Sequence, residues 1–215
     1  MKKALIVVDA QYDFMPASKE DYDNGMGGAL AVKEGDKIVP VINELLPKYD
    51  LVIFTKDWHK PDNIYFAASH AGKKPFEEME IHGKPEVLWP IHCVQNTKGA
   101  ELHDDIDFSL INGEFYIIKK GIESHCHPYG AFGDGHENTG LHEFLIEKGV
   151  RAVDIVGLAL DYCVKDTAKD AAYFGYETRI FIEGTRAIAE DVNDVLLEFD
   201  DSGVVVEEFY SHLYE

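Results

Sequence analysis

Short apolar runs alternate with amphipathic segments along almost the whole chain. Six runs rich in Val, Ile and Leu have the length of buried strands. They cover residues 4–8, 51–55, 115–118, 152–158, 178–182 and 204–206. Continuous apolar strands are typical of parallel sheets, because helices cover such sheets on both faces. The pattern therefore predicts a buried parallel sheet.

Four amphipathic segments between these runs predict the covering helices. Residues 36–46 place their apolar side chains at helical spacing. A second helix is expected to be capped by Thr139 and to end at Gly149. The others cover residues 161–174 and 191–199. This alternation predicts an α/β fold, a three-layer αβα Rossmann-like doubly wound sandwich, with residues 1–215 as a single domain.

Two long stretches do not fit that alternation. Residues 15–35 form a loop that contains Gly and Asp, and residues 60–113 hold many of the prolines. The second stretch is predicted to form a lid or wall over a site. No glycine-rich nucleotide motif follows any predicted strand, so the sequence gives no support to a nucleotide cofactor.

Composition narrows the choice of partners and of compartment. The chain has a formal net charge of −20, which repels nucleic-acid phosphates and anionic lipids. We therefore expect no nucleic-acid and no membrane partner. The chain has three Cys, an odd number, and shows no secretory signal and no membrane-spanning apolar run. These features predict reduced thiols and a cytoplasmic location.

Polar residues follow several predicted strands at the point where each strand ends. Asp9 and Asp57 follow the first two strands, Lys119 and Lys120 follow the third, and Cys163 lies just after the fourth. In a doubly wound sheet the ligand crevice lies at the carboxyl ends of the strands. We therefore expect two carboxylates, one ammonium group and one thiol to meet at a single edge.

Each of these residues also has a structural interpretation. A thiol in the first turn of a helix is expected to have a lowered pKa, but Cys163 could equally be an inert core residue. Asp13 competes with Asp9, which lies directly at the strand end. Lys119 and Lys120 point to opposite sides of their strand, so only one of them can face the site.

A second group of residues suggests a metal site. Asp57 and His59 have the i, i+2 spacing that lets both side chains point the same way from an extended segment, and His92 could join them. The alternative is a hydrogen-bonded Asp–His pair. The run of His125, Cys126 and His127 is interpreted as an exposed loop, because adjacent residues do not easily share one tetrahedral ion.

The motifs that contain these residues resemble those of the isochorismatase-like cysteine hydrolases, and within them the nicotinamidases. The match runs from about Lys3 to about Val206. It includes VVDAQYDF, TKDWH, LWPIHCVQNTKGAEL, KKG, YGAF, TGLHEFL and VGLALDYCVKDTAKDA. The resemblance implies the isochorismatase-like hydrolase fold, in agreement with the periodicity.

The resemblance also implies roles for individual residues. The catalytic triad would be Asp9, Lys120 and Cys163, which decides between the two lysines. The oxyanion hole would use the backbone N–H groups of Ala159 and Cys163. A cis peptide bond is implied between Leu158 and Ala159.

The metal ligands implied by the family are Asp57, His59 and His92. Phe14 and Trp89 would line a pocket for an aromatic ring; from the residues alone they could equally be core aromatics. The implied cofactor is one divalent metal ion, zinc first, with iron or manganese as alternatives.

One position departs from the family pattern. Many nicotinamidases place a further His where this chain has Asn63, which would be a weak or water-mediated ligand.

The implied reaction is hydrolysis of nicotinamide to nicotinate and ammonia through a cysteine thioester, in NAD salvage, with pyrazinamide as a further substrate. The alternatives are another small-amide or carbamoyl amidohydrolase, and a catalytically silent binding protein on the same fold. Whether the chain forms homo-oligomers is left open.

Overall fold

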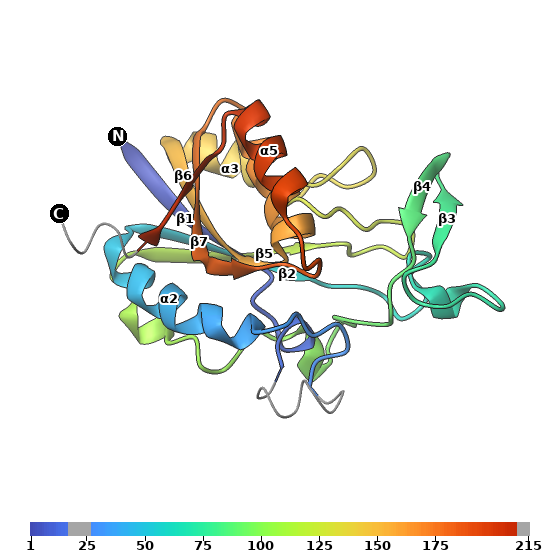
Figure 1. The fold of residues 1–215 in the computed structure, drawn as a ribbon. Coiled ribbons are helices and arrows are strands. Elements are labelled where there is room, and N and C mark those ends of the chain that lie inside the picture. The colour runs from blue at the N-terminus through green and yellow to red at the C-terminus, as the bar shows by residue number, and fades with distance from the viewer. Residues whose placement is uncertain (17–26, 210–215) are drawn as a thin grey trace.

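The computed structural model describes residues 1–16 and 27–209, and its ribbon is shown in Figure 1. The predicted fold class is confirmed: six parallel strands form one sheet in the order β5-β2-β1-β6-β7-β8. The strands are β1 (Lys2–Val8), β2 (Leu51–Asp57), β5 (Glu114–Lys120), β6 (Val150–Leu158), β7 (Glu177–Arg186) and β8 (Val205–Glu207).

Helices cover both faces of this sheet. Within residues 1–16 and 27–209 the α-helices are α2 (Ile38–Leu45), α3 (Leu141–Glu147), α4 (Lys165–Tyr173) and α5 (Asn193–Ser202). Figure 1 shows α2 on one face and α3 and α5 on the other. Side chains of β1 alternate between two cores: Leu5 and Val7 pack with α2, and Ala4, Ile6 and Val8 pack on the face of α3, α4 and α5. This double burial explains why the strands are apolar throughout.

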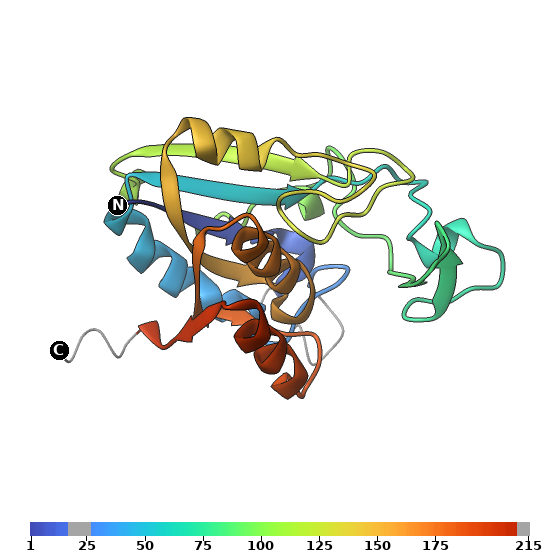
Figure 2. The same ribbon diagram turned by 90° about the horizontal axis from the view of Figure 1, so that it is seen from above.

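The strand order reverses once. From β1 the chain adds β2 and then β5 on one side, and later adds β6, β7 and β8 on the other. The reversal lies between β1 and β6, which are neighbours in the sheet (Figure 2). Ligands of doubly wound folds bind outside the carboxyl ends of the strands at such a point. The topology therefore places a candidate site beyond Val8 and Leu158.

Strand β5 differs from the buried strand expected over residues 115–118. It is an edge strand of the sheet, and Phe115 and Ile117 on its outer face are 46% and 45% exposed. The expectation of full burial was wrong, because strand order decides which strand lies at an edge and periodicity carries no information about that order.

Two helix starts also differ from expectation. Gly140, with a φ of 76°, and not Thr139 occupies the N-cap of α3. The Thr139 hydroxyl still accepts the N–H of Leu141, the first residue of α3, at 3.3 Å, and it donates to Ala131 O at 2.6 Å. The segment expected as one helix over residues 161–174 begins with a π-helical turn, Leu160–Val164, before α4 starts. Side-chain periodicity does not distinguish these backbone details.

The long stretch from 60 to 113 contains a hairpin and several short turns. Strands β3 (Glu78–Ile81) and β4 (Lys84–Val87) pair antiparallel and stand beyond the end of the main sheet (Figures 1 and 2). The 3₁₀ turns in the described part of the chain are Tyr12–Phe14, Gly35–Lys37, Leu46–Lys48, Ala67–Ser69, Lys98–Ala100 and Phe108–Leu110. Of the loop at 15–35, residues 17–26 lie outside the described residues. Within the described ranges no helix has both the length and the apolarity to cross a membrane.

Candidate active site

The carboxyl ends of four strands bring an ammonium group, two carboxylates and a thiol together. Lys120 Nζ lies 2.9 Å from Asp9 Oδ2 and 3.6 Å from Cys163 Sγ, and it also forms an ion pair with Asp57 Oδ1. Lys120, Asp9 and Asp57 are fully buried. The neighbouring Lys119 is exposed, with its Nζ 3.8 Å from the centroid of the Trp58 ring. The structure thus brings the predicted triad residues into contact and points Lys119 away.

The pKa values of the groups in this cluster are shifted in different directions. Burial raises the pKa of Asp9, opposed by Lys120 and reinforced by Asp57. Burial acts on Asp57 too, but Lys120 and His59 outweigh it and hold the pKa of Asp57 well below its usual range. For Lys120 itself, burial is outweighed by Asp57 and Asp9, so its pKa lies well above its usual range. Two neighbouring carboxylates with opposite shifts are suited to different roles.

The resting thiol differs from the sequence expectation. A position in the first turn of a helix was expected to lower the pKa of Cys163, but burial raises it well above its usual range, and Lys120 offsets this only in part. Asp9 and Asp57 push the thiol pKa in the same direction as burial. Cys163 therefore rests as a neutral thiol and needs a base to ionise, and Asp9 is the group placed to provide one.

Side chains of neighbouring strands hold the two carboxylates in place. The Thr55 hydroxyl donates to Asp9 Oδ1 at 2.6 Å and accepts from Asp9 N at 3.0 Å. Gln11 accepts from the backbone N–H of Asp57 at 2.8 Å and donates to its carbonyl oxygen at 2.8 Å. Because these contacts are buried, they fix the strand ends where the carboxylates emerge.

The turn that carries Cys163 follows β6 directly. The peptide bond between Leu158 and Ala159 is cis, as the family resemblance implied. The carbonyl of Ala159 accepts the N–H groups of Tyr162 and Val164, which winds the π-helical turn tightly around Cys163. The Asp161 carboxylate at this turn accepts the N–H groups of residues 188 and 189 at 3.0 and 2.8 Å. The turn and the 188–189 loop are therefore held as one unit.

Beside the triad, one carboxylate and three imidazoles converge. Asp57, His59, His92 and His127 each offer a ligand atom, and these atoms lie within 4.8 Å of one another. His59 Nε2 and His92 Nε2 lie 3.4 and 3.7 Å from Asp57 Oδ2. Their other ring nitrogens face Gly121 O at 3.0 Å and Pro90 O at 2.8 Å. Backbone carbonyls thus orient two of the imidazoles, as is usual for metal-binding histidines.

Several buried polar atoms of this group have no hydrogen-bond partner among the described residues. They are Asp57 Oδ2, His59 Nε2 and both ring nitrogens of His127. Leaving buried polar atoms unpaired is costly, so such a cluster indicates a missing ligand. Three imidazoles and one carboxylate are a donor set that suits a divalent transition metal, and the residues present therefore fit the implied cofactor.

His127 was missed as a site residue. The run at 125–127 was interpreted as an exposed loop, but Cys126 and His127 are only 1% and 4% exposed, and only His125 is exposed. The ring of His127 stacks on His59 with centroids 4.5 Å apart. The prediction was wrong because it considered three adjacent side chains as one group, whereas the chain turns two of them inward.

Asn63 is engaged in a different way from the one expected. Its amide oxygen accepts the N–H of Tyr65 at 2.9 Å, and its amide nitrogen donates to Cys126 O at 2.8 Å. Asn63 is therefore not among the converging ligand atoms. It holds the loop that carries His127, and His127 is the fourth residue whose side-chain atom lies in the converging group.

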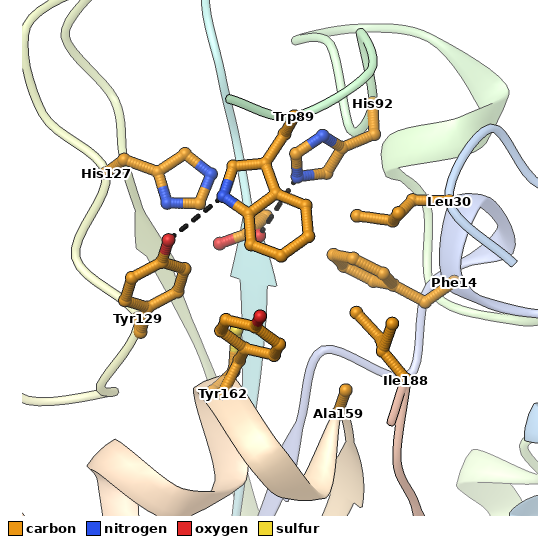
Figure 3. A pocket seen from close by; sticks show the side chains of 11 residues that line it. Phe14, Leu30, Trp89, His92, His127, Tyr129, Ala159, Tyr162 and Ile188 are labelled. Atoms are coloured by element: carbon orange, nitrogen blue, oxygen red, sulfur yellow. Dashed lines mark hydrogen bonds and ion pairs between the residues drawn. The ribbon is translucent and has the colours of Figure 1, made fainter. Parts of the chain in front are cut away.

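Cys163 lies in the lining of a narrow slot. Figure 3 shows the labelled side chains of its wall. Phe14 and Trp89 line it, as the resemblance implied, together with His92 and His127. The Trp89 indole N–H donates to Tyr129 Oη at 3.0 Å. Sequence reasoning missed the other side chains of the lining, which are Leu30, Tyr129, Tyr162 and Ile188. Two of them lie in motifs that carry the family resemblance: Tyr129 begins YGAF, and Tyr162 precedes Cys163 in the D-Y-C motif.

The slot has the composition of a site for a flat ring. Its free space is about 20 Å³, close to that of one water molecule. Aromatic and aliphatic side chains form most of its wall, and Asp57, His92 and Cys163 lie among them. Such a site selects a planar, largely apolar ligand with a few polar atoms at one end, and side chains of the wall must move to admit it.

The fold and the site together define a class of protein. The family model of the isochorismatase domain matches residues 3–206, and the chain belongs to this family. Its similar proteins include the nicotinamidase of Acinetobacter baylyi, which is 42% identical over 90% of this chain and 84% of the relative. A structure of an Acinetobacter baumannii nicotinamidase and pyrazinamidase superposes with a TM-score of 0.88 at 37% identity, over 99% of this chain and 98% of that one.

A third similar structure contains a metal. It is the pyrazinamidase of Pyrococcus horikoshii in complex with zinc, which is 36% identical with a TM-score of 0.76. The match covers 97% of this chain and all of that chain, 100%. The family of amidohydrolases thus includes a protein that binds zinc on this fold.

Proposed function

We propose that this protein hydrolyses nicotinamide to nicotinate and ammonia through a thioester on Cys163. The observation that carries the proposal is the contact of Lys120 with both Asp9 and Cys163 at the end of an aromatic slot. The similarity to nicotinamidases at up to 42% identity supports nicotinamide as the substrate. The Acinetobacter and Pyrococcus structures support pyrazinamide as a second one.

The triad residues catalyse two successive steps, formation of the thioester and its hydrolysis. Asp9 takes the proton of the Cys163 thiol, and the sulfur attacks the amide carbon. The protonated Asp9 then gives its proton to the leaving nitrogen, so that the C–N bond breaks and ammonia departs. The raised pKa of Asp9 suits a group that must hold this proton between the two steps. Water then attacks the thioester, with Asp9 again as base, and releases nicotinate and the thiol.

Lys120 and the turn at Cys163 stabilise the charges of this sequence. Lys120 Nζ lies 3.6 Å from the sulfur and 2.9 Å from Asp9, so it favours both the thiolate and the ionised carboxylate. We assign the backbone N–H groups of Ala159 and Cys163 to the oxyanion of the tetrahedral intermediate. Phe14 and Trp89 would hold the pyridine ring, because their side chains line the slot that ends at Cys163.

Asp57, His59, His92 and His127 would hold one divalent cation. The unpartnered atoms of this group support such an ion, and the zinc complex of the Pyrococcus relative supports zinc over iron or manganese. When bound, the cation supplies a Lewis acid for a ring nitrogen or a water molecule. Asn63 would act indirectly, by holding the loop of His127.

Replacing His127 with alanine tests the assignment of the fourth ligand. We expect the Kd for Zn²⁺ to rise by more than the roughly 100-fold that the loss of an outer-shell partner costs. Competition with a chromogenic chelator measures this constant. The control is His125→Ala, because His125 is exposed and belongs to the same run. Equal Zn²⁺ affinity in the two variants would show that His127 is not a ligand.

An assay of ammonia release tests the proposed substrate. The purified protein, loaded with Zn²⁺, is supplied with nicotinamide, pyrazinamide or a non-aromatic carbamoyl amide. We expect turnover of the two aromatic amides and little of the third, because the slot favours a planar ring. Faster turnover of the carbamoyl amide would contradict the proposed substrate and would indicate a carbamoyl amidohydrolase instead. Absence of turnover with every amide would favour a silent binding protein.

The cellular setting follows from this proposal. All three cysteines, Cys93, Cys126 and Cys163, are free, which supports a reducing compartment such as the cytoplasm. Nicotinate is a precursor of pyridine nucleotides, so the reaction would serve NAD salvage. The family match over residues 3–206 supports treating the chain as a single domain.

A further inference from the structure

A second cavity lies next to the proposed metal site. It has a volume of about 300 Å³, and it shares His127 and Tyr129 with the slot that leads to Cys163. His127 is therefore part of the wall between the two spaces. The first space is the aromatic slot already described, and the second space has a different chemistry.

The second cavity is acidic. Glu86 from β4, Asp134 from the loop before α3, and Asp166 and Asp170 from α4 line it, and Lys84 is the one lysine or arginine in its lining as described. We call these four carboxylates the acidic vestibule.

Little within the described residues neutralises the vestibule. On α4, Lys165 and Lys169 turn to Glu198, at 3.7 and 2.6 Å, instead of pairing with Asp166 or Asp170. The vestibule thus keeps an excess of negative charge next to the proposed metal site.

The backbone brings this charge close to the segment that carries His127. Gly130 has no side chain, and a Cβ at this position would lie only 2.5 Å from Asp170 Oδ2. The Asp170 carboxylate therefore packs directly against the chain three residues beyond His127. The negative charge of the vestibule thus lies beside the segment that carries His127.

His127 differs from the other two imidazoles of the cluster. His59 and His92 each have one nitrogen that faces a backbone carbonyl, at 3.0 and 2.8 Å. His127 is only 4% exposed, and neither of its nitrogens has a hydrogen-bond partner among the described residues. Of the three histidines, His127 is thus the one whose ring is not oriented by the backbone, and its ring separates the vestibule from the cluster.

We propose that the acidic vestibule is the entrance through which a divalent cation reaches the metal site, with His127 as the ligand that turns aside to admit it. This inference rests on the metal site assigned above. A hydrated cation is attracted by a cavity lined with carboxylates and is disfavoured in an apolar slot of about 20 Å³. The chain thus separates the path of the cation from the path of the aromatic substrate.

The Asp170 carboxylate of the vestibule destabilises the folded protein at neutral pH, which agrees with a functional role. Burial, together with Asp166 and against the effect of Lys169, raises the pKa of Asp170 to about 7. The folded protein therefore holds a proton on Asp170 that the unfolded chain loses above about pH 4. The stability penalty of Asp170 grows as the pH rises towards 7, and it is fully present above that value.

Asp170→Asn should therefore raise the Tm of the metal-free protein. We expect a larger increase at pH 8 than at pH 5, because at pH 5 most of the penalty is relieved by protonation. Thermal unfolding followed by circular dichroism at both pH values measures the difference. A Tm gain that is the same at both pH values would contradict the raised pKa of this half-buried carboxylate.

The rate of metal loading tests the entrance directly. Protein stripped of metal by a chelator is mixed with Co²⁺ in a stopped-flow instrument, and the ligand-field absorption of the bound ion is followed. At pH 8, above the pKa of about 7 of Asp170, the double variant Asp134→Asn/Asp170→Asn removes two charges of the vestibule. The control Asp200→Asn/Asp201→Asn removes two exposed charges of α5. Lys84→Gln changes the vestibule in the opposite sense.

At low ionic strength we expect the vestibule variant to load about tenfold more slowly than wild type, and Lys84→Gln to load faster. The control should match wild type, and all rates should converge at about 1 M salt. Equal loading rates for vestibule and control variants, with Co²⁺ still bound at one per chain, would overturn the entrance and leave the metal site intact. Absence of stoichiometric Co²⁺ in the wild type would overturn the metal site and the entrance together.

Discussion

Cys163→Ala should lower the turnover of nicotinamide by at least about 10⁴-fold, since nucleophile removal in a comparable triad costs this much or more. Cys163 is the thiol that contacts Lys120 Nζ, at 3.6 Å, whereas the thiols of Cys93 and Cys126 contact the backbone carbonyls of Gly99 and His136. The metal content should stay unchanged, because Cys163 is not in the group of Asp57 and the histidines. Steady-state ammonia release and elemental analysis measure the two quantities.

Cys126→Ala is the matched control for this variant. Cys126 is a buried free thiol, and the backbone carbonyl that Asn63 holds at 2.8 Å remains after the substitution. We expect this variant to keep most of its activity. Comparable activity in Cys163→Ala and Cys126→Ala would exclude a thioester at Cys163.

Lys120→Met should cost both activity and stability. The substitution leaves Asp9 and Asp57 buried without the ammonium group that now compensates them. Removing one partner of a buried ion pair typically destabilises a protein by about 3–5 kcal/mol. We therefore expect a loss of that size in the free energy of unfolding at pH 7, together with the loss of turnover. Urea denaturation of the metal-free protein measures it.

The control for this second prediction is the adjacent residue of the same strand. Lys119→Met removes the same charge from an exposed position over Trp58. An exposed ion pair or cation–π contact contributes about 1 kcal/mol or less, so the unfolding free energy should change little. If both variants were equally stable, the cluster at Lys120 would not be the buried charge network described above.

The strand-end residues were predictable because their chemistry contrasts with the strands that precede them. Asp9 and Asp57 follow continuous apolar runs, and parallel topology places the ends of such runs at one edge. Alternation along β5 allowed only one of Lys119 and Lys120 to face the site, and the family resemblance chose Lys120. The structure agrees, because Lys119 is exposed and Lys120 is fully buried.

The features that sequence reasoning missed depend on long-range packing. His127 lies in a loop that Asn63 fixes from 60 or more residues away, and no local pattern shows such a contact. The departure from the family pattern at Asn63 was interpreted as a weak or water-mediated ligand, and this interpretation did not point to His127. The exposure of Phe115 depends on β5 lying at the sheet edge, which follows from strand order rather than from the strand's own residues.

A single-turnover experiment with excess enzyme tests the nucleophilic role of Cys163 most directly. Nicotinamide is mixed with the Zn²⁺-loaded protein, and samples are quenched in acid at successive times. The quenched protein is digested, and the mass of the peptide that contains Cys163 is measured by mass spectrometry. The account predicts a transient nicotinoyl adduct on this peptide that rises with ammonia release and decays as nicotinate forms. Complete conversion of the substrate with Cys163 unmodified at every time point would contradict it.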